Sequence, residues 1–212
     1  MLIPEITDSL LERLDLFKIN PAHILIYGEQ TDRIKTALQQ RYPTSHIQTA
    51  SALITLNTHQ NNSIDFIISS FALHLEPEPT FLLNEFFRIL KINGLLLFST
   101  LGPDSFLELR KNSRDTNGLV DMHHIGDWLK ELRFNDPVMD MEKIILAYDS
   151  LDLLFQDFHY LQKLEYNPQF KTADYFPLTL EVLYGHAWKT ELPTESDEVA
   201  IPVSAIKRNK NK

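Results

Sequence analysis

Three short runs dominated by apolar residues place the strongest limit on how this chain can fold. They are Ile24–Tyr27, Ile64–Ser69 and Leu95–Ser99. A strand with one solvent-exposed face alternates apolar and polar residues, whereas a strand covered on both faces is apolar throughout. Because segments with helical spacing separate the three runs, the pattern predicts an α/β fold, with a parallel sheet between two layers of helices.

The other elements are predicted from the period of the apolar residues and from the positions of proline and glycine. Amphipathic helices are predicted at Glu5–Phe17, Asp32–Tyr42, Phe81–Leu90, Gly102–Asn112, His123–Arg133 and Leu151–Leu164, and further strands at Ile47–Thr49, Val138–Tyr148 and Leu178–Trp188. Asn93 and Gly94 predict a turn, and Ala50–Asn62 fits no single period. Residues 1–189 form one predicted domain, and residues 190–212, rich in proline and charge, are expected to be a mobile tail.

Composition argues against several classes of function. The chain has 212 residues and a formal net charge of −9, which disfavours binding to nucleic acid or to an anionic membrane. It has no cysteine, so disulfides, thiolate metal sites and cysteine nucleophiles are excluded. Neither a transmembrane run nor a signal sequence is evident, and a cytoplasmic protein is expected. The basic end, residues 207–212, is interpreted as a solvated terminus.

Several local phrases carry a resemblance to a known family. They are Leu10–Leu16, Asn93–Ser105, Glu108–Arg110, Asp121–Asp127, Phe134–Glu142 and Tyr184–Lys189. Together with the order of the elements, they resemble the BioC family, the malonyl-acyl-carrier-protein O-methyltransferases of biotin synthesis. This family belongs to the class I methyltransferases that use S-adenosylmethionine (SAM). The resemblance covers nearly the whole chain, and Gly102–Arg110 and Gly185–Lys189 are its most specific parts.

The resemblance implies a fold and a reaction. The fold is a three-layer Rossmann-like sheet, mostly parallel with a late antiparallel strand. The reaction is methyl transfer from SAM to the free carboxylate of a malonyl thioester. Because a carboxylate is already a nucleophile and a sulfonium already has a good leaving group, alignment and exclusion of water supply most of the catalysis. No general base is needed, and no catalytic residue is assigned.

The loop after the first strand departs from the family. The family has an acidic residue and then three alternating glycines, which let the backbone approach the cofactor. Here Ile26 replaces the acid, Gly28 remains, and Gln30 and Asp32 replace the other glycines. The added side chains are expected to intrude on the cofactor, although Glu29 and Asp32 offer an alternative in which carboxylates attract the cationic sulfonium. Loss of ordinary SAM binding is the favoured interpretation.

Three further departures surround the same site. Gln48-Thr49-Ala50 offers no carboxylate for the ribose hydroxyls. The segment between Ile47 and Ile64 is too short for a strand, a helix and a further strand, so one crossover is expected to be missing. The family also has an extra N-terminal helical segment over the cofactor, which this chain is expected to lack.

Candidate site residues follow from the resemblance. Those of the cofactor pocket are Tyr27, Gly28, Glu29, Ser69, Ser70 and Phe71, and those near the substrate are Arg110, Lys111 and Tyr184. An arginine can clamp a carboxylate through two hydrogen bonds, but a surface ion pair explains Arg110 equally well, and core packing explains Tyr184. No metal site is expected, because His123 and His124 are adjacent on a helix and have no evident third ligand.

Two main hypotheses follow. In the first, the chain keeps the methyltransferase fold with a degenerate SAM site and acts through a protein partner, which is an acyl carrier protein, an active methyltransferase paralogue or a second copy of itself. In the second, it is a working SAM-dependent methyltransferase with an unusual loop. A third is a pocket adapted to another small molecule. An acidic carrier protein requires a basic patch, for which Arg88, Lys91, Arg110 and Lys111 are the candidates.

Overall fold

A computed structural model describes residues 2–110, 119–157 and 176–191. Six strands form one sheet in the order β2-β1-β3-β4-β6-β5. The strands are β1 (His23–Gly28), β2 (His46–Ala50), β3 (Ile64–Ser70), β4 (Leu90–Leu101), β5 (Phe134–Tyr148) and β6 (Phe176–Lys189). The first four are parallel, and β6 pairs antiparallel with both β4 and β5. The predicted mostly parallel sheet with a late antiparallel strand is confirmed.

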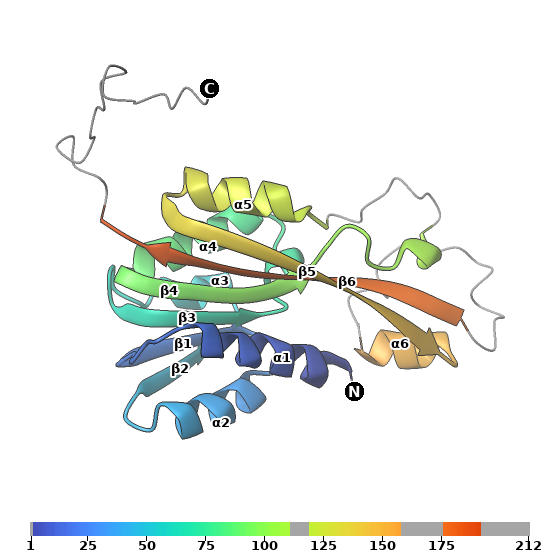
Figure 1. The fold of residues 1–212 in the computed structure, drawn as a ribbon, viewed down its shortest axis with the longest axis horizontal. Helices are drawn as coiled ribbons and strands as arrows, with labels where there is room; N and C mark the ends of the chain where they lie inside the picture. The colour runs from blue at the N-terminus through green and yellow to red at the C-terminus, as the bar shows by residue number, and fades with distance from the viewer. Residues whose placement is uncertain (1, 111–118, 158–175, 192–212) are drawn as a thin grey trace, which may run out of the picture.

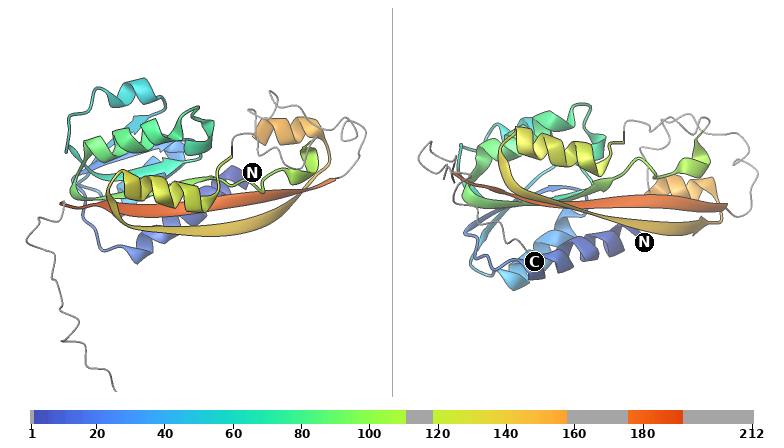
Figure 2. Two further views of the ribbon diagram at one scale, coloured as in Figure 1. Left: turned by 90° about the horizontal axis from the view of Figure 1, so that it is seen from above. Right: turned by 45° about the horizontal axis from the view of Figure 1, so that its top comes forward.

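Helices cover both faces of the sheet (Figures 1 and 2). On one face lie α1 (Leu2–Glu12) and α2 (Thr31–Arg41), and on the other lie α3 (Leu53–Leu56), α4 (Pro79–Ile89) and α5 (Met122–Glu131). Two separate groups of buried apolar side chains match these faces, one under α1 and α2 and the other under α4 and α5. The three-layer arrangement follows directly from strands that are apolar on both faces.

The far ends of β5 and β6 extend beyond the rest of the sheet as a long hairpin that carries α6 (Leu151–Asp157) (Figure 1). The predicted helix Leu151–Leu164 is described only to Asp157. Residues 192–212, where a mobile tail was expected, lie outside the described residues. No helix within the described ranges is long and apolar enough to cross a membrane.

The connection between β2 and β3 is short. It contains only the four-residue helix α3, and β2 is the last strand on its side of the sheet. The segment Ala50–Asn62, which fits no period, therefore supplies a single helical turn rather than a strand and a full helix. This agrees with the expected loss of one crossover.

Two predictions around β4 are wrong. Asn93 and Gly94 do not end a turn before the strand but lie inside β4, where Asn93 has a φ of 63° and the pairing register with β3 shifts. The predicted helix Gly102–Asn112 is absent as far as residue 110. A turn and the short 3-10 helix η3 (Leu107–Leu109) replace it, because Phe106 has a φ of 59° and its backbone N–H donates to Thr179 on β6.

Candidate functional site

The turn from β1 to α2 is tightly fixed against the end of β3. Gly28 has a φ of 100°, and a Cβ at this position would lie 2.2 Å from the carbonyl oxygen of Ser70. The backbone N–H of Glu29 donates to the same oxygen at 2.8 Å. Gln30 then takes a left-handed conformation with a φ of 56°, and α2 begins at Thr31. The one retained glycine thus allows β1 to pack closely on β3 and leaves no space for a Cβ.

The predicted cofactor residues lie together at the carboxyl ends of β1 and β3, but their side chains point to both faces of the sheet. In the pairing register, Tyr27 lies opposite Ser69 and Gly28 lies opposite Ser70. Tyr27 points toward α4, and its hydroxyl donates to Glu76 Oε1 at 3.0 Å. Burial and the Glu76 carboxylate raise the pKa of Tyr27, so it stays neutral. This side chain therefore serves the core beneath α4.

Two buried serines lie side by side on the opposite face. Ser70 and Ser99 are register partners on β3 and β4, and both are fully buried. Neither hydroxyl has a hydrogen-bond partner among the described residues. Buried hydroxyls normally have a partner, so these two are the clearest unsatisfied polar groups at the carboxyl end of the sheet.

Phe71 and His74 follow β3 and close this end of the sheet. Phe71 has a φ of 50°, its ring is buried, and it makes an edge contact with the imidazole of His74 at 5.9 Å between centroids. His74 Nδ1 lies 3.1 Å from Thr100 Oγ1, and burial lowers the pKa of His74 to about 3. A cavity of about 10 Å³ adjoins it, room for roughly one water molecule. His74 is half-buried, and its lowered pKa keeps the imidazole neutral.

Arg110 holds its own loop together. Its side chain is buried, and Nη2 donates to the carbonyl oxygens of Pro103 and Ser105. The same loop is attached to β6, because Gly102 N–H donates to Glu181 O at 2.9 Å and Glu108 accepts two hydrogen bonds from Thr179. Glu108 therefore bonds to Thr179 on β6, and Arg110 donates to main-chain oxygens of its own loop.

Replacing Arg110 with methionine should lower the free energy of unfolding by about 2 kcal/mol, because it leaves buried carbonyl oxygens without their donor. Chemical denaturation monitored by fluorescence measures this. Replacing the exposed Arg33, which pairs with Asp8 on the surface, with methionine provides the matched control and should change the stability far less. Equal losses in the two variants would contradict a structural role for Arg110.

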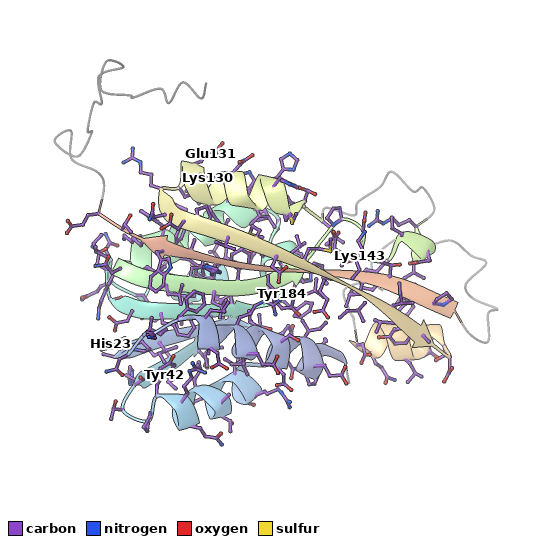
Figure 3. The ribbon with its side chains drawn as sticks, viewed as in Figure 1. His23, Tyr42, Lys130, Glu131, Lys143 and Tyr184 are labelled. Atoms are coloured by element: carbon purple, nitrogen blue, oxygen red, sulfur yellow. The ribbon has the colours of Figure 1, made fainter. Side chains whose placement is uncertain are left out.

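Tyr184 lies on β6 beneath α1 (Figure 3). The guanidinium of Arg13 stacks on its ring at 3.6 Å from the centroid and also pairs with Asp140 at 2.7 Å. Burial raises the pKa of Tyr184 to about 12, and its hydroxyl lies 3.4 Å from Glu142 Oε2. Sequence reasoning missed Arg13, which directly follows α1 and connects this end of the helix to the β5–β6 hairpin. Lys111 lies outside the described residues.

Of the residues considered for a basic patch, the three that the structure describes do not all lie together. Arg88 bonds to Glu85 and to the carbonyl oxygens of Leu56 and His59. Lys91 pairs with Asp65 at 2.8 Å near the start of β4, whereas Arg110 follows the other end of that strand.

In the described parts of the chain, no group of three or more His, Asp or Glu could hold a metal ion. Asp121 caps α5 by accepting from His123 N–H.

Comparisons with known proteins place the chain among methyltransferases. A methyltransferase-domain model matches residues 22–98. Malonyl-acyl-carrier-protein O-methyltransferase 1 of Coxiella burnetii is 32% identical, covering 96% of this chain and 88% of the relative. The malonyl-acyl-carrier-protein O-methyltransferase of Laribacter hongkongensis is 30% identical, covering 87% of this chain and 82% of the relative. The Coxiella alignment runs over 247 positions, more than this chain has residues, so the relative has segments without a counterpart here.

Solved structures support the same fold. The YcgJ protein of Bacillus subtilis has a TM-score of 0.59 at 11% identity, covering 87% of this chain and 99% of that one. A SAM-dependent methyltransferase of Archaeoglobus fulgidus has a TM-score of 0.55 at 14% identity, covering 88% and 94%.

Proposed function

The chain belongs to the malonyl-acyl-carrier-protein O-methyltransferase family, and from this premise we propose that it has lost ordinary SAM binding and acts in biotin synthesis through a protein partner. The turn between β1 and α2 carries the proposal. A cofactor loop needs backbone that a ligand can approach, which is what its glycines provide. Here the one glycine is covered by Ser70, the Glu29 N–H is bonded to the same residue, and Gln30 and Asp32 bring side chains.

The end of β2 gives independent support. In dinucleotide-type folds, an acidic side chain after the second strand binds the ribose hydroxyls. β2 ends at Ala50, and Ser51 and Ala52 follow before α3. Both the turn after β1 and the end of β2, two places at which this fold holds its cofactor, are therefore changed. For this reason we derive no methyl-transfer step for this chain.

One observation favours the alternative, a working SAM-dependent malonyl-acyl-carrier-protein O-methyltransferase with an atypical loop. The hydroxyls of Ser70 and Ser99, which have no hydrogen-bond partner within the described parts of the chain, lie at the carboxyl end of the sheet, next to the turn at Gly28. Such groups gain stability when a ligand or a water satisfies them. Because methylation of a carboxylate needs no general base, the lack of a catalytic residue does not separate the two functions.

Calorimetric titration with SAM and with S-adenosylhomocysteine separates them. We expect no saturable heat with either ligand, because the backbone of the turn is already bonded within the protein. An authentic family member such as the Coxiella protein, measured in the same buffer, is the positive control. Micromolar binding, or transfer of a labelled methyl group to malonyl-acyl carrier protein, would overturn the proposal.

The double variant Gln30→Gly with Asp32→Gly tests whether the turn is the cause. Gln30 already has a φ that favours glycine, so this change is compatible with the backbone. If the turn alone blocks the cofactor, the variant should give saturable heat with SAM at concentrations at which the unmodified chain gives none. Unchanged titrations would assign the loss to other parts of the site, such as the end of β2.

A further inference from the structure

We infer that the apolar part of the C-terminal tail, residues 199–206, binds in a groove between α1 and α2 of the same chain. This goes beyond the proposed function, and its test does not involve SAM. The tail as a whole is rich in proline and charge, but residues 199–206 read Val-Ala-Ile-Pro-Val-Ser-Ala-Ile and carry no charge. Segments that stay solvated are poor in such residues. This apolar run therefore favours a bound segment over the mobile tail that the overall composition predicts.

The groove lies between the C-terminal ends of α1 and α2, which run side by side on one face of the sheet (Figure 1). Its volume is about 330 Å³, within the range of sites that bind small apolar ligands. Leu14, in the 3-10 helix η1 (Arg13–Leu16) that follows α1, and Leu38 on α2 are fully buried and form its floor. The lining is completed by Leu11, Ala37, Gln40 and Arg41, the last two of which are exposed. An apolar floor with a polar rim suits short aliphatic side chains.

The tail leaves the sheet close to this groove. β6 ends at Lys189, and the ring of Trp188 packs edge-on against the ring of Phe17, with 5.9 Å between centroids. Phe17 directly follows η1, and its backbone N–H donates to the carbonyl oxygen of Leu14 at 3.1 Å. From Glu191, the last described residue, the chain can extend about 26–29 Å before the apolar run begins. A link of this length holds the apolar run at a high local concentration near the groove.

Charge selects the tail over a separate partner. The apolar run is followed directly by residues 207–212, of which four are lysine or arginine, whereas the whole chain has a charge of −9. Two residues that line the groove, Leu11 and Leu14, are followed in the sequence by the exposed acids Glu12 and Asp15. An apolar run in the groove therefore brings the basic end toward these carboxylates, which attract it. A separate partner has to displace a segment that carries both features and is already tethered nearby.

Engineered disulfides in the full chain test the inference. The chain has no cysteine, so Gln40→Cys with Ala205→Cys places one thiol on the rim of the groove and one in the apolar run. The control is Lys130→Cys with Ala205→Cys. Lys130, labelled in Figure 3, is exposed near the end of α5 on the other face of the sheet, and β5 then begins at Phe134, the register partner of Lys189. A free tail starts close to this control site as well.

In dilute solution, oxidation should close the disulfide within one chain at least about tenfold faster for the Gln40 pair than for the Lys130 pair, because binding raises the local concentration of the second thiol. Gel mobility and mass spectrometry of the peptides measure the two rates. Equal rates would mean that the tail samples both faces of the sheet alike, and a product linked mainly between two chains would mean that the groove takes the tail of another copy. Either result would overturn the inference.

Two further changes in the tail separate binding from tethering. In the Gln40 pair, Ile201→Asp with Val203→Asp should slow closure to the rate of the Lys130 pair, because carboxylates are costly to bury in an apolar groove. The matched control, Thr194→Asp with Ser196→Asp, adds the same charge before the apolar run and should leave the rate unchanged. All four positions lie in the tail, outside the sheet and its helices. A fast closure that survives the changes at Ile201 and Val203 would show that the apolar run does not hold the tail.

Discussion

Replacing Gly28 with alanine should lower the free energy of unfolding by about 4 kcal/mol. This is the largest effect that we expect from a single substitution. Two costs combine. A non-glycine residue at a φ of 100° is strained by about 1–3 kcal/mol, and overpacking adds about 1–3 kcal/mol. The clash is with the carbonyl oxygen of Ser70, at 2.2 Å from the added Cβ, and with Ala72 Cβ at 2.9 Å. Since the first obstacle is backbone, a side-chain rotation cannot relieve it.

Gly126→Ala is the matched control for this experiment. Gly126 lies within α5, and its added Cβ would meet only Met139 Cγ, at an ordinary contact distance of 3.8 Å. A helical glycine replaced by alanine should raise stability by about 0.5–1 kcal/mol. The urea concentration at the midpoint of unfolding should therefore fall for Gly28→Ala and rise for Gly126→Ala, relative to the unmodified chain. A Gly28→Ala protein as stable as the unmodified chain would show that the β1–β3 contact is looser than the structure indicates.

Lys189→Met should lower the free energy of unfolding by about 3 kcal/mol. Lys189 is buried at the end of β6, and its ammonium donates to Asn62 Oδ1, Phe87 O and Leu90 O at 2.7 to 2.9 Å. Two of these acceptors are carbonyl groups at the end of α4, where helices leave carbonyls without partners. Burial lowers the pKa of Lys189, but the hydrogen bonds offset that cost. Methionine keeps the volume and removes all three donors, each loss costing about 1 kcal/mol.

Lys143→Met is the corresponding control, since it makes the same substitution on the adjacent strand. Lys143, which is labelled in Figure 3, is half exposed and pairs with Asp104 at 2.6 Å. An exposed ion pair contributes little to stability, because solvent screens it. In thermal denaturation, the midpoint temperature of Lys189→Met should be well below that of Lys143→Met. Similar midpoints would mean that the carbonyl groups of α4 find other donors when the amine is removed.

Much of the fold could be predicted from the sequence because it depends on local patterns. The runs at Ile24, Ile64 and Leu95 became the central strands β1, β3 and β4, since residues apolar on both faces have no stable place outside a covered sheet. The helix after Pro79 and the one after Asp121 also follow from local signals, the second with its capping hydrogen bond. The family resemblance was confirmed by relatives that cover most of the chain.

The loop at Gly102–Arg110 could not be predicted in this way. Proline and spaced apolar residues favour a helix there, but the backbone donors of Gly102 and Phe106 bond to residues more than seventy positions later in the chain. A bond partner at that sequence distance leaves no local signal. The same reason explains Arg110, whose type suggested a ligand for a carboxylate, whereas its described contacts are carbonyl oxygens of its own loop.

This loop has a consequence for the order in which the protein folds. β3 and the first part of β4 can pair as soon as both have left the ribosome, but Gly102 and Phe106 wait for Glu181 and Thr179. Closing so long a loop is slow, because its entropy is lost before the contacts form. During synthesis, the loop and the apolar end of β4 are therefore exposed until β6 emerges. We expect nascent chains that stop before β6 to be the species that chaperones hold and proteases cut.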